Sequence, residues 1–322
     1  MTFELNLPLA RSAVDRDYLT RESEELLAEI LSHADTRVLV LHNGLTILHG
    51  TADAPEPAIR LLALGDVPEA LHTVYLGKTE VEQGEDPAGT RVVLRVIGAD
   101  SAARLSATSG GWHHLRRTGA GLTDRDAGLF SQALAIANWH EHNTFCPACG
   151  SETKVERAGW SRRCLSDDRE LFPRTDPAII VGVTDHADRI LLGSQGIWEE
   201  NRYSILAGFV EPGESLEAAV RREMVEEAGV VVGQPIYLGS QAWPFPYSLM
   251  MGFTAKLAEG FAAGFAEPDG QEIEKLRWFT REELVAEAPN LLLPARVSIA
   301  RAIIERWLGF QVESATELDA RP

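Results

Sequence analysis

The sequence predicts an α+β protein with two separate domains and a small cysteine-containing module between them. The 322 residues are enough for two domains, and strand-like and helix-like runs occur in both halves of the chain. A C-x-x-C pair near the middle of the chain marks the module. We expect an N-terminal domain at 1–142, the module at 143–176, a C-terminal domain at 177–309 and a mobile tail at 310–322.

The N-terminal domain contains no motif that points to chemistry, and its sequence indicates only helices and strands. Apolar spacing predicts helices over Asp17–His33 and Asp124–His142. Apolar runs between turn residues predict strands at Arg37–His42, Thr46–His49, Ile59–Leu64, Val74–Leu76 and Thr90–Ile97. The histidine pair in Trp112–His114 is interpreted as polar surface rather than as a metal site.

The C-terminal domain alternates strands and helices. Strands are expected at Ala178–Thr184, Ile190–Leu192, Ser204–Phe209, Val230–Leu238, Leu249–Lys256 and Leu276–Phe279. Helices are expected at Glu282–Ala286, at Arg296–Leu308 and between Ser215, an acceptable N-cap, and Gly229, a typical C-cap glycine.

The cysteine module has the spacing of a zinc knuckle. Cys146 and Cys149 form the C-x-x-C pair, and Cys164 lies where the second half of a zinc ribbon would begin. Asp167 stands near the position of the expected fourth cysteine, with Asp168 and His142 as alternative ligands. The sequence leaves two interpretations open, a structural Zn²⁺ site or a hairpin that packs without metal.

The stretch Gly208–Val230 organises the C-terminal domain. It follows the pattern G-x5-E-x7-R-E-U-x-E-E-x-G-U, where U is a bulky apolar residue. Glu223, Glu226 and Glu227 stand at i, i+3 and i+4 of the expected helix, so their carboxylates share one face. Such like charges need compensation, which Arg222 and divalent cations such as Mg²⁺ or Mn²⁺ would provide. The alternative is a solvated acidic helix face.

These residues together resemble a complete Nudix box, the signature of hydrolases that act on nucleoside diphosphates linked to another moiety. The resemblance implies an α/β/α sandwich in which Glu223, Glu226 and Glu227 bind the catalytic metals while water attacks one phosphorus. Glu227 is the residue that we expect to deprotonate the water, with Glu226 as the alternative, and Arg222 orients a carboxylate.

A second array lies beyond the box. Ser240–Met250 reads SQAWPFPYSLM and resembles the S-Q-P-W-P-F-P-x-S-L-M array of the NADH pyrophosphatases, with Ala242 in place of a proline. Trp243 and Phe245 could stack on a base or pyridine ring, and Gln241 and Ser248 offer hydrogen bonds. A stiff, packed loop is the alternative interpretation.

The resemblance extends to residues outside these two stretches. It implies that Phe209 and Phe172 clamp the nicotinamide half, with Phe172 supplied by a partner subunit of a homodimer. Glu272 matches an additional metal-binding carboxylate, with Glu274 as its rival. Ile180 and Ala300 are the remaining positions implied to line the substrate pocket.

The reaction that the resemblance implies is metal-dependent hydrolysis of NADH, and more weakly NAD⁺, to nicotinamide mononucleotide and AMP. Removal of NAD caps from RNA 5′ ends is a further activity of such families. Two alternatives stay open. One is a Nudix hydrolase for ADP-ribose or another nucleoside diphosphate derivative, and the other is a non-catalytic nucleotide sensor.

Composition limits the partners. A formal net charge of −18 argues against broad binding to nucleic acid or to anionic membranes, both of which need a basic surface. Neither a signal peptide nor an apolar run of membrane-spanning length is expected. Three cysteines, two of them in C-x-x-C, favour metal binding in a reducing compartment, so we expect a cytoplasmic protein. A dimerisation role is the expectation for residues 1–142.

Overall fold

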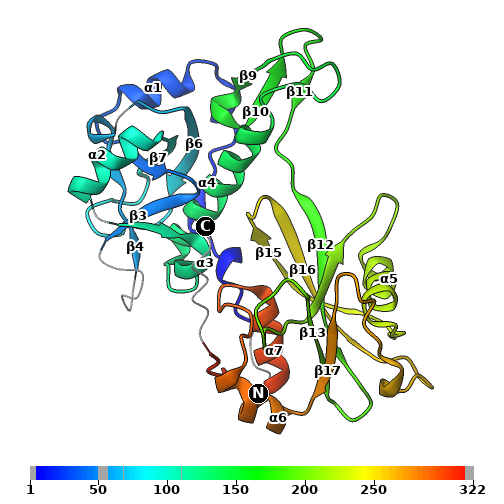
Figure 1. Ribbon diagram of the computed structural model, residues 1–322. Coiled ribbons are helices and arrows are strands. Elements are labelled where there is room, and N and C mark those ends of the chain that lie inside the picture. Colours follow the sequence, from blue (N-terminus) through cyan, green and yellow to red (C-terminus); the bar gives the residue numbers. More distant parts are fainter. Residues whose placement is uncertain (1–4, 50–56, 68, 110, 316–322) are drawn as a thin grey trace. The chain divides into compact units, whose positions relative to one another are not determined.

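The computed structural model describes residues 5–49, 57–67, 69–109 and 111–315, and these form two compact units (Figure 1). The N-terminal unit comprises Leu9–Thr175 together with Ala242–Tyr247. The C-terminal unit comprises residues 5–8, Asp176–Gln241 and residues 248–315. The chain therefore leaves the C-terminal unit after Gln241 and returns to it at Ser248.

A mixed sheet forms the middle layer of the C-terminal unit. Its strands run in the order β15-β16-β12-β13-β17, and β14 also pairs with β12. Their bounds are β12 Asp176–Thr184, β13 Ile190–Ser194, β14 Leu206–Phe209, β15 Ile236–Trp243, β16 Ser248–Lys256 and β17 Lys275–Phe279. Strands β12 and β16 pair in parallel over nine residue pairs, and the other pairings in this sheet are antiparallel where their register is defined.

Helices cover both faces of this sheet. They are α5 Leu216–Ala228, α6 Arg281–Glu287 and α7 Ile299–Leu308. Because side chains alternate along a strand, Ile179 packs in the cluster that contains Met224 of α5, while its neighbour Ile180 packs in the cluster that contains Ile303 of α7. Figure 1 shows α5 and α7 on opposite sides of the sheet, as the expected α/β/α sandwich requires.

Among its described residues, the N-terminal unit contains three sheets and four α-helices. Two of the sheets have the orders β1-β6-β7-β2-β5 and β4-β3-β8. The strands are β1 Val14–Asp15, β2 Arg37–Leu41, β3 Leu45–His49, β4 Ala58–Ile59, β5 Leu62–Ala63, β6 His72–Thr79, β7 Arg91–Val96 and β8 Trp112–His114. The helices are α1 Leu26–Ser32, α2 Ala99–Ser109, α3 Leu115–Thr118 and α4 Asp124–His142.

The cysteine module packs inside the N-terminal unit. Its sheet, β11-β10-β9, consists of β9 Thr153–Glu156, β10 Ser161–Cys164 and β11 Glu170–Leu171. Gly159 has a φ of +102°, and a Cβ at this position would lie 2.6 Å from a methyl of Val74 on β6. The indole of Trp160 donates to the carbonyl of Tyr75 at 2.7 Å. These contacts connect the module to the N-terminal domain, and both belong to the same compact unit. Short 3₁₀ segments occur at Pro8–Ala10, Thr20–Glu22, Leu64–Asp66, Arg157–Gly159, Ala263–Phe265 and Ala288–Asn290.

Several of the sequence expectations need correction. The long helix at Asp17–His33 is limited to α1 because Asp17 has a φ of +47° and its carboxylate binds Lys78 and the hydroxyl of Tyr75. The strand at Val230–Leu238 begins only at Ile236, after Pro235, which has no N–H to donate to a sheet. Helix α2 was not expected. Helix α7 begins at Ile299 rather than Arg296, because Ser298 is its N-cap.

A further difference concerns the tail. Val312 is buried, and the guanidinium of Arg301, itself buried on α7, donates to the Val312 carbonyl and to the Ser314 hydroxyl. Residues 310–315 are therefore packed rather than mobile. Residues 316–322 lie outside the described residues.

Candidate active site

The box helix α5 begins and ends at residues that the sequence marks. The Ser215 hydroxyl accepts a hydrogen bond from the N–H of Ala218, and Gly229 closes the helix with a left-handed φ of +62°. Ala219, Val220 and Met224 are completely buried against the sheet. Ala219, Val220 and Met224 form the apolar side of the helix that packs in the core. The glutamates of the box occupy the other positions of the helix.

Arg222 connects the glutamates of the box to the loop that precedes the helix. Its guanidinium donates to both carboxylate oxygens of Glu214, at 2.7 and 2.9 Å, and to Glu223 and Glu226 at 2.8 Å each. The same group donates to the carbonyl of Phe209 at 2.9 Å. The hydrogen bonds that Glu214 accepts from Arg222 and from the N–H of Glu211 lower the pKa of Glu214 to about 2. Arg222 thus orients three carboxylates, as expected for a positioning residue.

Glu223 lies directly against β14 because residue 208 is glycine. A Cβ on Gly208 would lie 1.9 Å from the carboxyl carbon of Glu223, which is closer than any two such atoms approach. Burial raises the pKa of Glu223 above its usual range, and the nearby charges of Glu226 and Glu272 add to the rise, although Arg222 opposes it. The first glycine of the box therefore allows the carboxylate of Glu223 to occupy this position.

Glu227 is the most perturbed carboxyl group of the site. Its side chain is buried, and its Oε2 has no hydrogen-bond partner among the described residues. Burial raises the pKa of Glu227 to about 8, with further contributions from the charges of Glu223, Glu272, Asp269 and Glu226. A strongly perturbed pKa in a cluster of like charges is typical of a functional carboxylate.

The structure brings Glu272 to the same cluster from a distant part of the sequence. Asp269 accepts hydrogen bonds from the N–H groups of Gln271, Glu272 and Ile273, and its own N–H donates to the carbonyl of Glu227. This turn places Glu272 where its charge raises the pKa of both Glu223 and Glu227. Its rival Glu274 lies instead beside Gly196. Sequence reasoning missed Asp269, although the pair Asp269-Gly270 is a turn signal.

The donor set fits a hard divalent cation. Carboxylate oxygens are the ligands that Mg²⁺ and Mn²⁺ prefer, and a cation would neutralise the mutual repulsion of Glu223, Glu226, Glu227 and Glu272. The unpartnered Oε2 of Glu227 is the kind of buried oxygen that such an ion satisfies.

The residues expected to line the substrate pocket lie in different environments. Phe209 and Phe172 are exposed, each with 61% of its surface accessible. Ile180, Gln241 and Ala300 are buried, and Gln241 donates to the carbonyl of Val297 at 3.0 Å. Ser248 is partly buried at the start of β16. Trp243 and Phe245 belong to the N-terminal unit, where their rings pack edge-to-face with centroids 4.9 Å apart.

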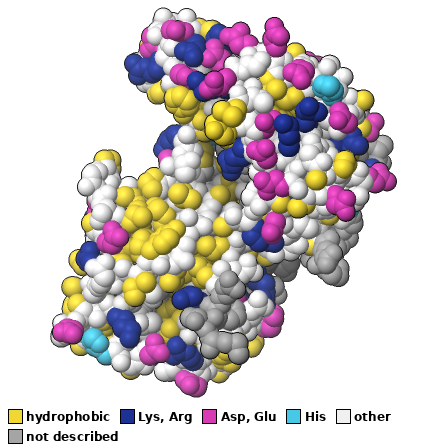
Figure 2. Space-filling view, turned by 180° about the vertical axis from the view of Figure 1, so that it is seen from behind, with side chains coloured by type: hydrophobic (Ala, Val, Ile, Leu, Met, Phe, Trp, Pro, Cys, Tyr) yellow, Lys and Arg dark blue, Asp and Glu magenta, His cyan; other side chains and the backbone are white. Residues whose placement is uncertain are grey.

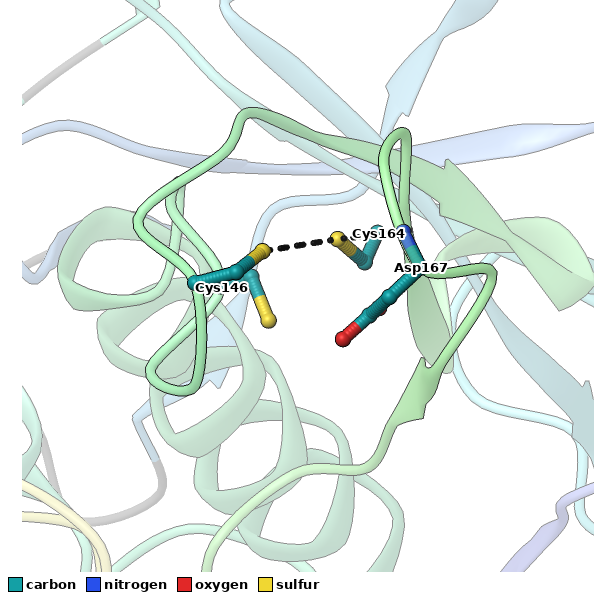
Figure 3. Close-up of side chains that lie close together, drawn as sticks. Cys146, Cys164 and Asp167 are labelled. Carbon is teal, nitrogen blue, oxygen red and sulfur yellow. Dashed lines mark hydrogen bonds between the residues drawn. The ribbon is translucent and has the colours of Figure 1, made fainter.

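The cysteine module brings together the four ligands expected for zinc. The ligand atoms of Cys146, Cys149, Cys164 and Asp167 all lie within 4.8 Å of one another. Cys146, Cys164 and Asp167 turn toward a common centre, and the sulfurs of Cys149 and Cys164 are 3.5 Å apart (Figure 3). Three thiols and one carboxylate at such distances suit a tetrahedral zinc ion without an open position. Asp167, rather than Asp168 or His142, is the residue in this cluster.

Comparison with known proteins agrees with this architecture. Three family models match in series: an NADH pyrophosphatase-like rudimentary NUDIX domain over residues 35–139, an NADH pyrophosphatase zinc ribbon domain over 141–172 and a NUDIX domain over 173–302. The chain is 40% identical over 314 residues to the NAD-capped RNA hydrolase NudC of Mycobacterium tuberculosis, covering 93% of this chain and 94% of the relative. This chain belongs to the NADH pyrophosphatase family of Nudix hydrolases.

Other similar proteins match smaller parts of the chain. A human NAD-capped RNA hydrolase is 38% identical over 202 residues, covering 58% of this chain and 43% of that protein. A NUDIX hydrolase structure from Nitrosomonas europaea matches 53% of this chain and 96% of its own, at 24% identity and a TM-score of 0.38. In the described part of the chain, none of the helices has the length and apolar character needed to cross a membrane.

Proposed function

We propose that this protein hydrolyses the diphosphate bond of NADH, and of NAD⁺ more weakly, to nicotinamide mononucleotide and AMP. The observation that carries the proposal is the carboxylate cluster around Glu227, whose buried Oε2 has no hydrogen-bond partner in the described part of the chain, together with the domain order of the NADH pyrophosphatases. Removal of NAD caps from RNA is part of the proposal, because the NudC relative is named for that substrate.

The roles of the residues follow from their contacts. Glu223, Glu226, Glu227 and Glu272 would hold Mg²⁺ or Mn²⁺, which supplies charge neutralisation of the diphosphate oxygens when bound. Glu227 accepts a proton from the attacking water, whose oxygen forms a bond to one phosphorus while the bridging P–O bond breaks. Arg222 keeps Glu214, Glu223 and Glu226 in place through the hydrogen bonds described above.

Substrate recognition is assigned to the residues that the resemblance to the NADH pyrophosphatases implies. We propose that Phe209, exposed next to Arg222, stacks on the nicotinamide, and that Gln241, Trp243, Phe245 and Ser248 shape the nucleotide pocket. Ile180 and Ala300 are buried, so they support this pocket by packing.

The assembly and the environment of the protein are part of the same proposal. The exposed ring of Phe172 supports a homodimer in which each subunit contributes this ring to its partner's site. The Cys₃Asp cluster supports a structural Zn²⁺, and its three free cysteines suit the reducing cytoplasm. Light scattering of the purified protein tests the dimer, because a monomer at micromolar concentration would contradict it.

Product analysis tests the activity. Purified protein is incubated with NADH, NAD⁺, ADP-ribose and an NAD-capped RNA, each with Mg²⁺, with Mn²⁺ and with EDTA. We expect AMP and reduced nicotinamide mononucleotide from NADH, only when metal is present. Glu227→Gln should lower kcat by about 10²-fold or more, the effect typical of a general base. Glu217→Gln on the same helix is the matched control and should retain activity.

The outcomes separate this function from its alternatives. Turnover of ADP-ribose without NADH would retain the hydrolytic site and overturn the substrate. Tight nucleotide binding without turnover of any substrate would instead indicate a sensor. Mn²⁺ binding measured by calorimetry should weaken in Glu227→Gln, which tests the ligand assignment independently of turnover.

A further inference from the structure

The segment that contains the end of β15 and the turn into β16, called the loop below, belongs to a different compact unit from the rest of the sheet. Gln241 and Ser248 belong to the C-terminal unit, whereas Ala242–Tyr247 belong to the N-terminal unit. Prolines 244 and 246 have no N–H, so this loop has few donors of its own for a ladder of hydrogen bonds. Its conformation must therefore be set by contacts with other residues.

One side chain satisfies the backbone of the loop at two points. The amide of Asn138, on α4, donates to the carbonyl of Pro244 at 3.0 Å and to the carbonyl of Pro246 at 2.9 Å. An asparagine amide has two N–H donors, and both are used here. The two carbonyls flank Phe245, so Asn138 fixes the backbone on both sides of that aromatic residue.

The aromatic side chains of the loop are held by α3 and by the strand before it. The ring of Phe245 stacks on His114, with centroids 5.4 Å apart and planes inclined by 18°. The Arg116 guanidinium lies 4.2 Å from the ring centroid of Phe245 and 5.1 Å from that of Trp243. Arg174 lies 5.2 Å from the ring of Tyr247. Cation–π contacts of this kind contribute to holding a ring in one orientation.

These contacts assign a role to the N-terminal unit. We propose that Asn138 and Arg116 are positioning residues that hold the Ala242–Tyr247 loop in the conformation needed for NADH recognition, so that the rudimentary NUDIX domain acts as a scaffold for substrate selectivity. This inference rests on the proposed function, because it assigns selectivity to that activity. It also means that Phe245 works mainly as an anchor of the loop, since His114 and Arg116 already contact its ring.

The variant that tests the proposal is Asn138→Asp, which has the same shape and lacks both donors. We expect faster hydrogen–deuterium exchange in a peptide covering residues 240–250, and a KM for NADH raised by about 10-fold with kcat changed by less than about 3-fold. Hydrolysis of ADP-ribose, which lacks the nicotinamide, should change by less than about 2-fold, since the box is intact. Arg116→Leu should act in the same direction, and Arg116→Lys should retain part of the selectivity because it keeps the charge.

Arg117→Ala is the matched control, because Arg117 is an exposed arginine on the same short helix. It should leave both the exchange rate and the KM unchanged. Unchanged exchange in Asn138→Asp would show that Asn138 does not hold the loop, and faster exchange with an unchanged KM would show that the loop does not select NADH. Either result overturns the proposal. A wild-type protein that is inactive on NADH overturns the proposed function and the selectivity claim, while the exchange measurement still decides whether Asn138 anchors the loop.

Discussion

Glu227 shows how one buried carboxyl group couples the chemistry of the site to stability. Its folded-state pKa of about 8 lies above the ordinary value of 4.5, because burial and four neighbouring acidic groups disfavour the charged form. The folded, metal-free protein therefore binds a proton that the unfolded chain releases at lower pH. The stability that Glu227 contributes is complete below about pH 4.5 and is lost as the pH rises through about 8.

This linkage predicts a pH-dependent gain in stability for Glu227→Gln. In EDTA, we expect the variant to unfold at a higher temperature than the wild type at pH 9, with a difference on the order of 1–3 kcal/mol in the free energy of unfolding. At pH 5 the difference should nearly vanish, since the wild-type carboxyl is then neutral. Thermal denaturation at a series of pH values measures the effect, with Glu217→Gln as the control. An equal difference at pH 5 and pH 9 would contradict the prediction.

Residue 208 is glycine because a larger side chain would collide with the Glu223 carboxylate, and not because its backbone conformation requires glycine. Gly208→Ala would force the carboxylate of Glu223 out of its position on β14, because the added Cβ would lie 1.9 Å from the Glu223 carboxyl carbon. We expect kcat for NADH to fall by about 10²-fold, the loss that a displacement of about 1 Å can cause. Steady-state kinetics on the folded variant measure it. Gly264→Ala, at a position with open space, should leave kcat unchanged.

At the scale of the elements, two helices were predicted with the bounds that they have in the structure. Helix α4 has the bounds that the sequence indicates, because Thr123 caps it and its apolar residues repeat with helical spacing. The box helix likewise ends at Gly229, whose left-handed conformation stops it. Strand β15 was placed too early because Val230 and Val232 have the apolar character of strand residues, and the structure buries them in the core cluster of α5 instead.

In the cysteine module, Asp167 takes the place of the fourth cysteine that a zinc ribbon usually has. Asp167→Ala should weaken Zn²⁺ binding by at least about 10-fold, and Asp167→Cys should restore or exceed the wild-type affinity, since a thiolate binds zinc well. Zinc content and competition with a chromophoric chelator measure the affinity. Asp168→Asn is the control, because asparagine tolerates the left-handed backbone of residue 168, which has a φ of +58°. Equal zinc retention in all four proteins would show that Asp167 is not a ligand.

At the scale of the whole molecule, the net charge of −18 affects how strongly the protein binds long anionic substrates. On the face shown in Figure 2, basic side chains lie among acidic ones instead of forming a continuous basic surface. The body of a capped RNA should therefore be repelled, and the repulsion should be screened by salt.

Salt dependence tests this consequence of the net charge. Between about 20 and 150 mM monovalent salt, at constant Mg²⁺, we expect kcat/KM for an NAD-capped RNA to rise by roughly 2- to 5-fold. The value for NADH, a much smaller anion, should change less and serves as the internal control. A steep fall for the RNA would reveal a basic binding surface and contradict the prediction.

The sequence by itself determined the chemistry that is local in the chain. Glu223, Glu226 and Glu227 share a face because helix geometry places residues at i, i+3 and i+4 together, and Ser215 and Gly229 define the ends of that helix. The spacing of Cys146 and Cys149 likewise indicated the metal module. Such features depend only on interactions between residues close together in the chain, so the sequence is enough to predict them.

Only the tertiary structure decided which distant residues meet. It placed Glu272 near Glu227 through the turn at Asp269, selected Asp167 over its alternatives and brought Asn138 to the loop after β15. It also buried Val312, although the C-terminal segment that contains this residue is mostly polar. Contacts between residues far apart in the chain depend on how the packed elements are arranged, and no local spacing contains that information.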